Sequence, residues 1–437
     1  RPAAAAAAST RDMSFQAAAL VGTPVAVTTS APRSFRRSTA SSRRTPVAPR
    51  ADAVKEIDQV ALTEELTLAA RQFIPASMGV TLRATIGGVN NYVRYVDCDD
   101  GKTYVLRLYN NGGETKRVAF ESAVISALQP QKSRLSFAIP TCVPSIATGE
   151  TFVVLPSGNS TSLYELIPGV LPKNSCARAI GMASGELTSV MLDIEHEVRA
   201  VAPVSSTPPY RNFLCNVSGA FASKGMTREI FYQQAEQSPG PLDAVRPAID
   251  ILLEQLRALE GTLEEYKAMG SGPDAFPESL IHGDLHYDNV LVSSTPDGHV
   301  TGLLDFEFTA YDWRAMELAV CLSKYVGEPE PMDYIVDFIE GFAVNGELND
   351  NEINAIPELT KLRVLEVVVY FVARAYLGED DISQLTTRAV NYANRLVWVD
   401  NNRDAMILTL RTALNKAKEK KNGGAVVVKQ LVRETNR

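Results

Sequence analysis

Cysteine is scarce in this chain, and its cysteines are scattered. The 437 residues include five, namely Cys98, Cys142, Cys176, Cys215 and Cys321, with no C-x-x-C pair among them. Zinc sites and disulfide frameworks are recognised by closely spaced cysteines, so the pattern predicts reduced, structural thiols. Uninterrupted apolar runs of about 18 residues are also lacking, which argues against a transmembrane helix.

Positive charge is in deficit over most of the chain. There are 43 Lys and Arg residues against 51 Asp and Glu residues, which gives a net charge of −8. This balance argues against a nucleic-acid-binding protein. The first 50 residues are the exception, because they carry +7 and leave −15 for residues 51–437.

The basic N-terminal segment is rich in Ala, Ser, Thr and Pro and has no hydrophobic periodicity. Arg-rich, Ser-rich and acid-poor composition is typical of an organelle transit peptide. We therefore expect residues 1–52 to be a disordered transit peptide, with a plastid (chloroplast) favoured over a mitochondrion and Met13 as a candidate start. The alternative is a disordered basic tail without a targeting role.

The most informative segment is residues 281–317, IHGDLHYDNVLVSSTPDGHVTGLLDFEFTAYDWRAME. It contains the spacing H-x-D-x-x-x-x-N, formed by His282, Asp284 and Asn289. Two short apolar runs follow on either side of a Pro-Asp-Gly turn, and the second ends at Asp305. This pattern predicts a β-hairpin, which returns the chain and places Asn289 beside Asp305.

Such a cluster suits phosphoryl transfer, in which positioning and charge neutralisation do most of the work. The carboxylate of Asp284 can orient or deprotonate an attacking hydroxyl. The amide oxygen of Asn289 and the carboxylate of Asp305 can hold Mg²⁺ on the phosphates of ATP, because Mg²⁺ prefers oxygen ligands and takes few from protein. The alternative is an ordinary hairpin with surface acids.

HGDLHYDN followed by LLDFE resembles the kinase-like small-molecule phosphotransferases. This family includes aminoglycoside phosphotransferases, choline and ethanolamine kinases, type II homoserine kinases and methylthioribose kinases. Gly283 stands where protein kinases have Arg, and Asp305-Phe306-Glu307 replaces D-F-G, as is usual in the small-molecule kinases. The resemblance covers roughly residues 55–400, and it makes a scaffold role more probable than a base role for His282. His286 and Asp288 either line the substrate side or shape the loop.

The N-terminal part carries weaker signals for nucleotide binding. Residues 80–109 alternate like three antiparallel strands, with a turn at Gly87-Gly88 where kinase-like folds cover the phosphates. A plain hairpin turn is the alternative, and the sequence has no G-x-x-x-x-G-K-[ST] phosphate-binding loop. In the third strand Arg107 stands where the family usually has a Lys that clamps the phosphates; arginine keeps the charge but is bulkier and makes forked contacts.

A helix expected at about 115–128 places Glu121 on its apolar face. A carboxylate on an apolar stripe needs a cation, and Arg107 is the natural partner. In the alternative, Glu121 pairs in solvent with Arg117 one turn earlier. We take Gly87, Gly88, Arg107 and Glu121 as the candidate nucleotide-binding residues.

The predicted fold is α+β, with the two lobes of a protein kinase. We expect an antiparallel sheet lobe at residues 53–165, a helical catalytic lobe at 166–420 and a mobile tail at 421–437. Two further strands are expected within 138–155. Helices are expected at 56–72, 175–192, 226–237, 241–268, 313–326, 331–344, 350–377, 382–398 and 402–420. The irregular residues 199–224 are interpreted as a surface loop rather than as part of a substrate pocket.

The resemblance implies ATP-dependent phosphorylation of a hydroxyl on a small metabolite, with a homoserine kinase-like enzyme as the best match. The alternatives are a choline, ethanolamine or aminoglycoside kinase-like enzyme and a non-catalytic nucleotide-binding relative. The favoured substrates are amines, so Glu307, Asp312 and Glu317, which follow Asp305 closely, are candidate ligands for a substrate ammonium group. Neither a nucleic acid nor a membrane is expected as a partner.

Overall fold

The computed structural model describes residues 59–85, 91–172, 174–205, 209–215, 232–233, 236–237, 240–269, 275–295, 298–376 and 382–435. The chain divides into two units, Arg1–Ala51 and Asp52–Arg437, and all of the described residues belong to the second unit. The expected transit peptide, the turn at Gly87-Gly88 and most of the helix expected at 226–237 lie outside the described residues.

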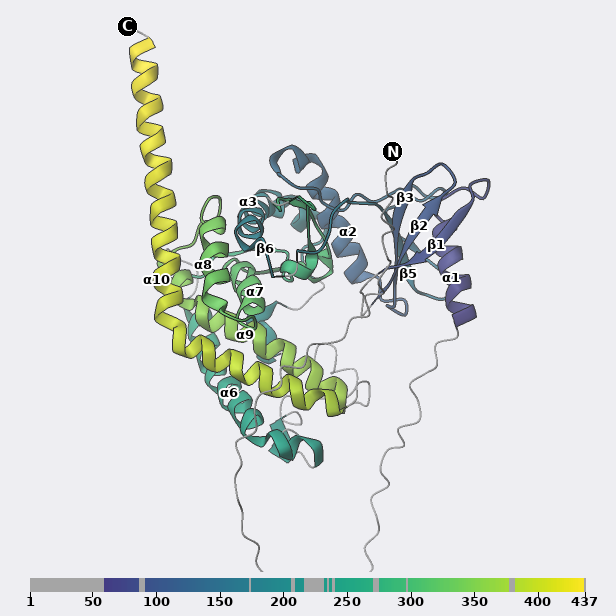
Figure 1. The fold of residues 1–437 in the computed structure, drawn as a ribbon. Coiled ribbons are helices and arrows are strands. Elements are labelled where there is room, and N and C mark those ends of the chain that lie inside the picture. Colours follow the sequence, from purple (N-terminus) through teal and green to yellow (C-terminus); the bar gives the residue numbers. More distant parts are fainter. Residues whose placement is uncertain are drawn as a thin grey trace, which may run out of the picture. The chain divides into compact units, whose positions relative to one another are not determined.

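The N-terminal lobe is an antiparallel sheet of five strands in the order β1-β2-β3-β5-β4 (Figure 1). The strands are β1 (Val80–Ala84), β2 (Asn91–Cys98), β3 (Thr103–Tyr109), β4 (Val153–Val154) and β5 (Ser160–Glu165). Helix α1 (Gln59–Arg71) contributes Leu66 to a buried cluster with Leu106, Leu108 and Leu163 of the sheet. The three strands predicted within 80–109 are therefore confirmed.

The prediction of two strands within residues 138–155 is largely wrong. That segment contains the two-residue strand β4 and isolated bridges at Ala138 and Cys142. Pro140 and Pro144 lack backbone N–H donors and interrupt the alternation, so a continuous ladder cannot form there. The sheet is completed by β5 instead, whose register places Ser162 opposite Arg107 of β3.

The hairpin predicted in the second lobe is present. Strand β7 (Val290–Val292) pairs with β8 (Val300–Leu303), and Val290 lies opposite Leu303. The N–H of Leu304 donates to the carbonyl oxygen of Asn289 over 2.9 Å, so Asn289 and the end of β8 lie side by side as predicted. A second pair, β6 (Glu278–Ile281) with β9 (Ala310–Trp313), brackets this hairpin.

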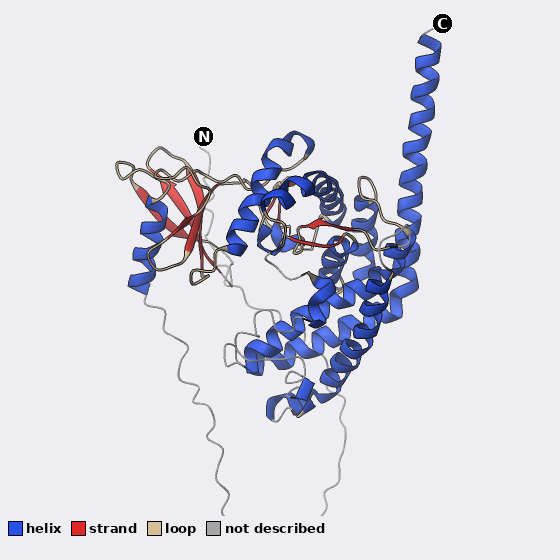
Figure 2. Ribbon diagram, turned by 180° about the vertical axis from the view of Figure 1, so that it is seen from behind, coloured by secondary structure: helices blue, strands red, loops and turns tan. Residues whose placement is uncertain are grey.

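Helices make up most of the C-terminal lobe (Figure 2). The longer ones are α3 (Ala177–Val201), α6 (Arg246–Ala268), α7 (Ala315–Tyr325), α8 (Pro331–Phe342), α9 (Asp350–Tyr376) and α10 (Ile382–Thr435). Helix α2 (Lys116–Leu128) follows β3 in the chain and packs its Phe120 and Leu128 into the same core as these helices. Short 3₁₀ segments are η1 (Gln129–Arg134), η2 (Tyr210–Cys215), η3 (Gly240–Val245), η4 (Tyr287–Asn289) and η5 (Phe306–Phe308). None of the helices in the described ranges combines the length and apolar character that membrane crossing requires.

The two helices predicted at 382–398 and 402–420 form one continuous helix, α10, which runs on to Thr435. Two polar residues between the expected helices have partners in the structure. Asp400 forms an ion pair with Lys361 of α9 at 2.7 Å, and the side-chain amide of Asn402 donates to the carbonyl oxygen of Trp398 over 2.8 Å. The expected boundary at residue 420 is therefore not a helix end.

Helices α3 and α8 pack closely because glycine lies at their contact. A Cβ atom added to Gly181 of α3 would lie 2.1 Å from the carbonyl oxygen of Phe338 on α8. A Cβ atom on Gly341 of α8 would lie 2.0 Å from the carbonyl oxygen of Arg178. Both obstacles are backbone atoms, so a larger residue forces the helices apart rather than displacing a side chain.

We expect Gly181→Ala to lower the free energy of unfolding by about 1 to 3 kcal/mol, because the added methyl group meets backbone that cannot yield. The measurement is chemical denaturation. Gly261→Ala on α6 is the matched control, since nothing lies within 4 Å of its added Cβ atom. That control should be neutral or stabilising by up to about 1 kcal/mol, as expected for Gly→Ala in a helix interior. Equal effects of the two substitutions would contradict the account of the packing.

Candidate active site

The loop that carries Asp284 is anchored by its backbone. The Oε2 atom of Glu317 on α7 accepts hydrogen bonds from the N–H groups of His282 at 2.8 Å and Gly283 at 3.2 Å. The side chain of His282 is fully buried, and its Nε2 atom lies 3.0 Å from the carbonyl oxygen of Leu304 at the end of β8. These contacts tie both sides of the hairpin to one helix.

Glycine at position 283 is required by this geometry. Its φ is +77°, in the left-handed region that side chains disfavour. An added Cβ atom would lie 2.5 Å from the carbonyl oxygen of Phe308. The loop can therefore reach its buried position only with glycine after His282.

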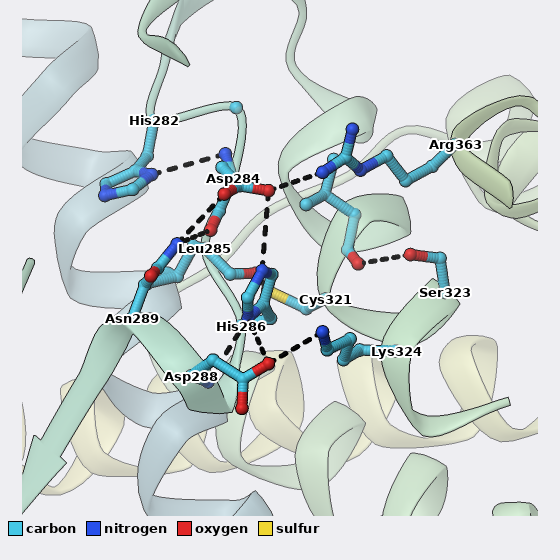
Figure 3. A network of polar contacts seen from close by, with 12 residues as sticks. His282, Asp284, Leu285, His286, Asp288, Asn289, Cys321, Ser323, Lys324 and Arg363 are labelled. Atoms are coloured by element: carbon cyan, nitrogen blue, oxygen red, sulfur yellow. Dashed lines mark hydrogen bonds and ion pairs between the residues drawn. The ribbon is translucent and has the colours of Figure 1, made fainter. Parts of the chain in front are cut away.

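Asp284 lies between an amide and a guanidinium (Figure 3). The Nδ2 atom of Asn289 donates to the backbone oxygen of Asp284 over 2.8 Å and to its Oδ2 atom over 3.0 Å. Arg363 of α9 donates to the Oδ1 atom, and the Nε2 atom of His286 is 3.5 Å from the same oxygen. Burial opposes ionisation of this carboxyl, yet Arg363 and the neighbouring histidines hold the pKa of Asp284 well below its usual range.

A second cluster gathers three carboxylates around Arg107. The guanidinium of Arg107 on β3 contacts Glu121 of α2 at 3.2 Å, Asp305 at 2.9 Å and Glu307 at 3.0 Å. Asp305 has the left-handed φ of +65°, and its side chain remains 32% exposed, compared with 12% for Arg107. The sheet of the first lobe and the end of the hairpin thus meet through one arginine.

The predicted partnership between Arg107 and Glu121 is confirmed, and the alternative pairing of Glu121 with Arg117 in solvent is not observed. Glu121 is 3% exposed, and its Oε2 atom also accepts a hydrogen bond from Tyr109 at 3.0 Å. Burial raises the pKa of Glu121 to about 7, although Arg107 lowers it. Burial thus favours the protonated form of Glu121, whereas Arg107 favours the carboxylate.

The three acids considered for binding a substrate ammonium group have other partners. Glu307 contacts Arg107 and accepts a hydrogen bond from Asn91 at 3.0 Å. Asp312 is fully buried and accepts backbone N–H bonds from Trp313 at 2.7 Å and from Tyr210. Burial raises the pKa of Asp312 to about 6, despite Arg211 nearby. The geometry favours structural roles for all three acids, with Glu317 as the anchor of the Asp284 loop.

His286 and Asp288 lie next to Asp284. The N–H of Asp288 donates to the Nδ1 atom of His286 over 3.2 Å, and the carboxylate of Asp288 forms an ion pair with Lys324 at 2.7 Å. These contacts shape the turn that leads to Asn289. The contacts of His282 likewise fit the expected scaffold role, because its ring nitrogen reaches the backbone at Leu304.

Sequence reasoning did not single out three residues that surround Asp284. Arg363 and Glu366, on α9, form an ion pair with each other beside it. Tyr210 donates from its hydroxyl to the carbonyl oxygen of Gly283 over 2.6 Å, so part of the segment expected to be a surface loop covers the Asp284 loop. One available signal was Glu366, an acid within the apolar run of α9, because such a residue needs a nearby cation.

The residues present fit a divalent cation held on phosphates. Asp305 offers a partly exposed carboxylate at the end of β8, and Asn289 offers an amide whose nitrogen is already engaged by Asp284. The oxygen of that amide therefore remains as its ligand atom. Two oxygen ligands of this kind suit a cation that takes its other ligands from phosphates and water.

We expect Glu121→Gln to change how stability depends on pH. The raised pKa means that the folded state binds this proton more tightly than the unfolded chain, so the contribution is complete below about pH 4.5 and is lost as the pH rises through 7. As the pH rises between these values, the free energy of unfolding of the glutamine variant should therefore increase relative to that of the wild type by about 2 to 3 kcal/mol. Denaturation across that range measures the difference, and a constant difference would contradict the assignment.

Solved structures share this fold. A microcompartment-associated aminopropanol kinase is 19% identical, with a TM-score of 0.59 over 80% of this chain and 99% of its own. An amicoumacin kinase in complex with AMP-PNP and Ca²⁺ is 16% identical, with a TM-score of 0.53 over 79% of this chain and 94% of its own. The predicted two-lobe, protein-kinase-like α+β fold is thereby confirmed.

Several homoserine kinases are related to this chain by sequence. That of Bradyrhizobium diazoefficiens is 30% identical over 122 residues, which are 27% of this chain and 36% of the relative. That of Rhizobium johnstonii is 26% identical over 156 residues, 35% of this chain and 42% of the relative. The chain thus spans about a third to two fifths of the length of these relatives. The model of the phosphotransferase enzyme family (APH) matches residues 81–351, so this chain belongs to that family.

Proposed function

We propose that the chain catalyses ATP-dependent phosphorylation of a hydroxyl group on a small amino-acid or amino-alcohol metabolite, with homoserine as the first candidate. The observation that carries this proposal is the pairing of Asp284 with Asn289, beside the end of the hairpin that bears Asp305. Family membership supports the reaction class, because the matched region includes all three residues.

Asp284 would orient the acceptor hydroxyl by accepting its hydrogen bond. The contact with Arg363 keeps this carboxylate ionised, and a carboxylate that is hard to protonate is a weak base. We therefore assign Asp284 to alignment of the hydroxyl oxygen, with proton removal late in the transfer. Asn289 holds the carboxylate in place through its Nδ2 atom.

Asp305 and Asn289 would hold Mg²⁺ on the nucleotide. When bound, Mg²⁺ with ATP supplies the phosphoryl group and neutralises its charge. Arg107 contacts Asp305, so its guanidinium lies beside the carboxylate proposed to hold the cation. It is the candidate for the phosphate clamp that the family usually builds from lysine. Gly87 and Gly88 remain candidates for the loop over the phosphates.

Homoserine is favoured over choline, ethanolamine and aminoglycosides because the relatives found by sequence are homoserine kinases. An amino-alcohol kinase is the second candidate, since the aminopropanol kinase shares the fold along most of this chain. A nucleotide-binding protein without catalysis is disfavoured, because Asp284, Asn289 and Asp305 are all present and placed together.

The proposal predicts ADP release from Mg-ATP that depends on one alcohol. The panel comprises homoserine, choline, ethanolamine, hydroxylysine, methylthioribose and an aminoglycoside. Asp284→Asn should lower kcat by roughly 10²- to 10⁴-fold, because it removes the group that aligns the hydroxyl. ATP binding by the variant, followed by calorimetry, should be retained. Stimulation that survives unchanged in the variant would contradict the role of Asp284. No stimulation of ADP release by any alcohol of the panel would favour an acceptor outside the panel or a nucleotide-binding protein without catalysis.

We further propose that residues 1–52 direct import into a plastid. The support is compositional, with a net charge of +7 in the first 50 residues and an abundance of Ser, Thr and Ala. A fluorescent protein fused behind residues 1–52 should accumulate in plastids of plant cells. Replacing the arginines of this segment with glutamine is the control, and it should leave the fusion in the cytosol. Mitochondrial accumulation, or no import of the original fusion, would refute the proposal.

A further inference from the structure

Arg363 is an unexpected neighbour for a group that handles an acceptor hydroxyl. Its guanidinium donates to the Oδ1 atom of Asp284, whereas Asn289 binds the Oδ2 atom (Figure 3). A cation at this place lowers the proton affinity of Asp284, which is a disadvantage for an acid–base group. Its position therefore calls for a benefit other than proton transfer.

The guanidinium is held in a fixed orientation. Its NH2 group binds Asp284 and its NH1 group binds Glu366, which lies one turn further along α9. The ring of Tyr210 lies 5.6 Å from its Cζ atom and covers one face. A guanidinium carries five N–H groups in a rigid fork, so these two bonds leave it able to bind a further planar anion.

Glu366 supplies the opposite charge at the same place. Its side chain is 28% exposed, compared with 13% for Arg363, so it borders solvent next to Asp284. Asp284 and Glu366 together outweigh the single positive charge of Arg363. The three side chains therefore present one positive and two negative charges side by side. This arrangement complements a ligand that carries both a negative and a positive charge.

We propose that Arg363 and Glu366 recognise the carboxylate and the ammonium group of an α-amino acid acceptor whose hydroxyl lies at Asp284. This inference rests on the proposed kinase function and narrows its substrate class to hydroxylated α-amino acids. An amino alcohol such as choline or ethanolamine has no anion for Arg363, so the N–H groups of the guanidinium that Asp284 and Glu366 do not bind would gain no anionic partner from it. Arg363 and Glu366 thus act as specificity-determining residues, in place of Glu307, Asp312 and Glu317.

Three acceptors distinguish recognition of the carboxylate from recognition of the ammonium group. Homoserine has both, 3-aminopropan-1-ol is homoserine without the carboxylate, and 4-hydroxybutanoate is homoserine without the amine. Steady-state ADP release with Mg-ATP gives kcat and KM for each of them on the full chain. The wild type should prefer homoserine over either analogue by roughly 10- to 100-fold in kcat/KM, because each analogue lacks one of the two charged groups that Arg363 and Glu366 would bind.

Charge-removing variants then test each contact. Arg363→Gln should raise KM for homoserine and for 4-hydroxybutanoate by roughly 10- to 100-fold, with a smaller effect on 3-aminopropan-1-ol. Glu366→Gln should raise KM for homoserine and for 3-aminopropan-1-ol, with a smaller effect on 4-hydroxybutanoate. Because Arg363 also contacts Asp284, kcat can change for every acceptor, and the ratio of kcat/KM values between acceptors isolates recognition. Arg363→Lys keeps the charge and should retain part of the preference for carboxylates.

A matched control is Arg411→Gln. Arg411 is on α10 and pairs with Asp350 at the start of α9, the helix that carries Arg363. This variant should leave the acceptor ratios unchanged. Thermal unfolding of each variant checks folding, and Glu366→Gln carries the test if Arg363→Gln does not fold.

Different outcomes would contradict the recognition by Arg363 and Glu366 and the kinase function. Efficient turnover of homoserine with equal losses for all acceptors in both variants would overturn the inference, show a purely structural ion pair and leave the kinase function standing. A wild type that prefers 3-aminopropan-1-ol would also overturn it. A wild type that phosphorylates none of the three acceptors would contradict the proposed homoserine kinase function and the inference together.

Discussion

The structure depends on one buried guanidinium that holds three carboxylates. Arg107 joins β3 of the sheet lobe to Glu121 of α2 and to Asp305 and Glu307 at the end of the hairpin. Burying so much charge is costly unless each group has a partner, and loss of one partner leaves the others uncompensated. The site proposed for the nucleotide phosphates would therefore also be the junction of the two lobes, and nucleotide binding and lobe contact would share the same residues.

The acceptor side follows the same principle with a different arginine. Arg363 of α9 faces Asp284, and Glu317 of α7 fixes the loop through two backbone N–H groups. Two helices that follow the loop in the sequence, α7 and α9, thus hold it in place. The rigid placement of Asp284 supports alignment of a hydroxyl as its main contribution to the reaction.

Local patterns revealed the hairpin, the first three strands and the helix bearing Glu121, because each depends on periodicity and turn residues within a short window. They also brought Asn289 to the end of β8 beside Asp305. They could not reveal Arg363, which lies 79 residues from Asp284 and reaches it only through the packing of α9. Residues just after Asp305 were expected to face a substrate, but strand β9 and helix α7 turn Asp312 and Glu317 into the core.

A crystal structure with a non-hydrolysable ATP analogue, Mg²⁺ and homoserine tests the central claim most directly. The account predicts the homoserine hydroxyl within hydrogen-bond distance of Asp284, about 2.6 to 3.2 Å, with the metal on Asn289 and Asp305. The carboxylate of homoserine should contact Arg363. A hydroxyl placed away from Asp284 while the nucleotide is bound, or a metal held without Asp305, would contradict the account.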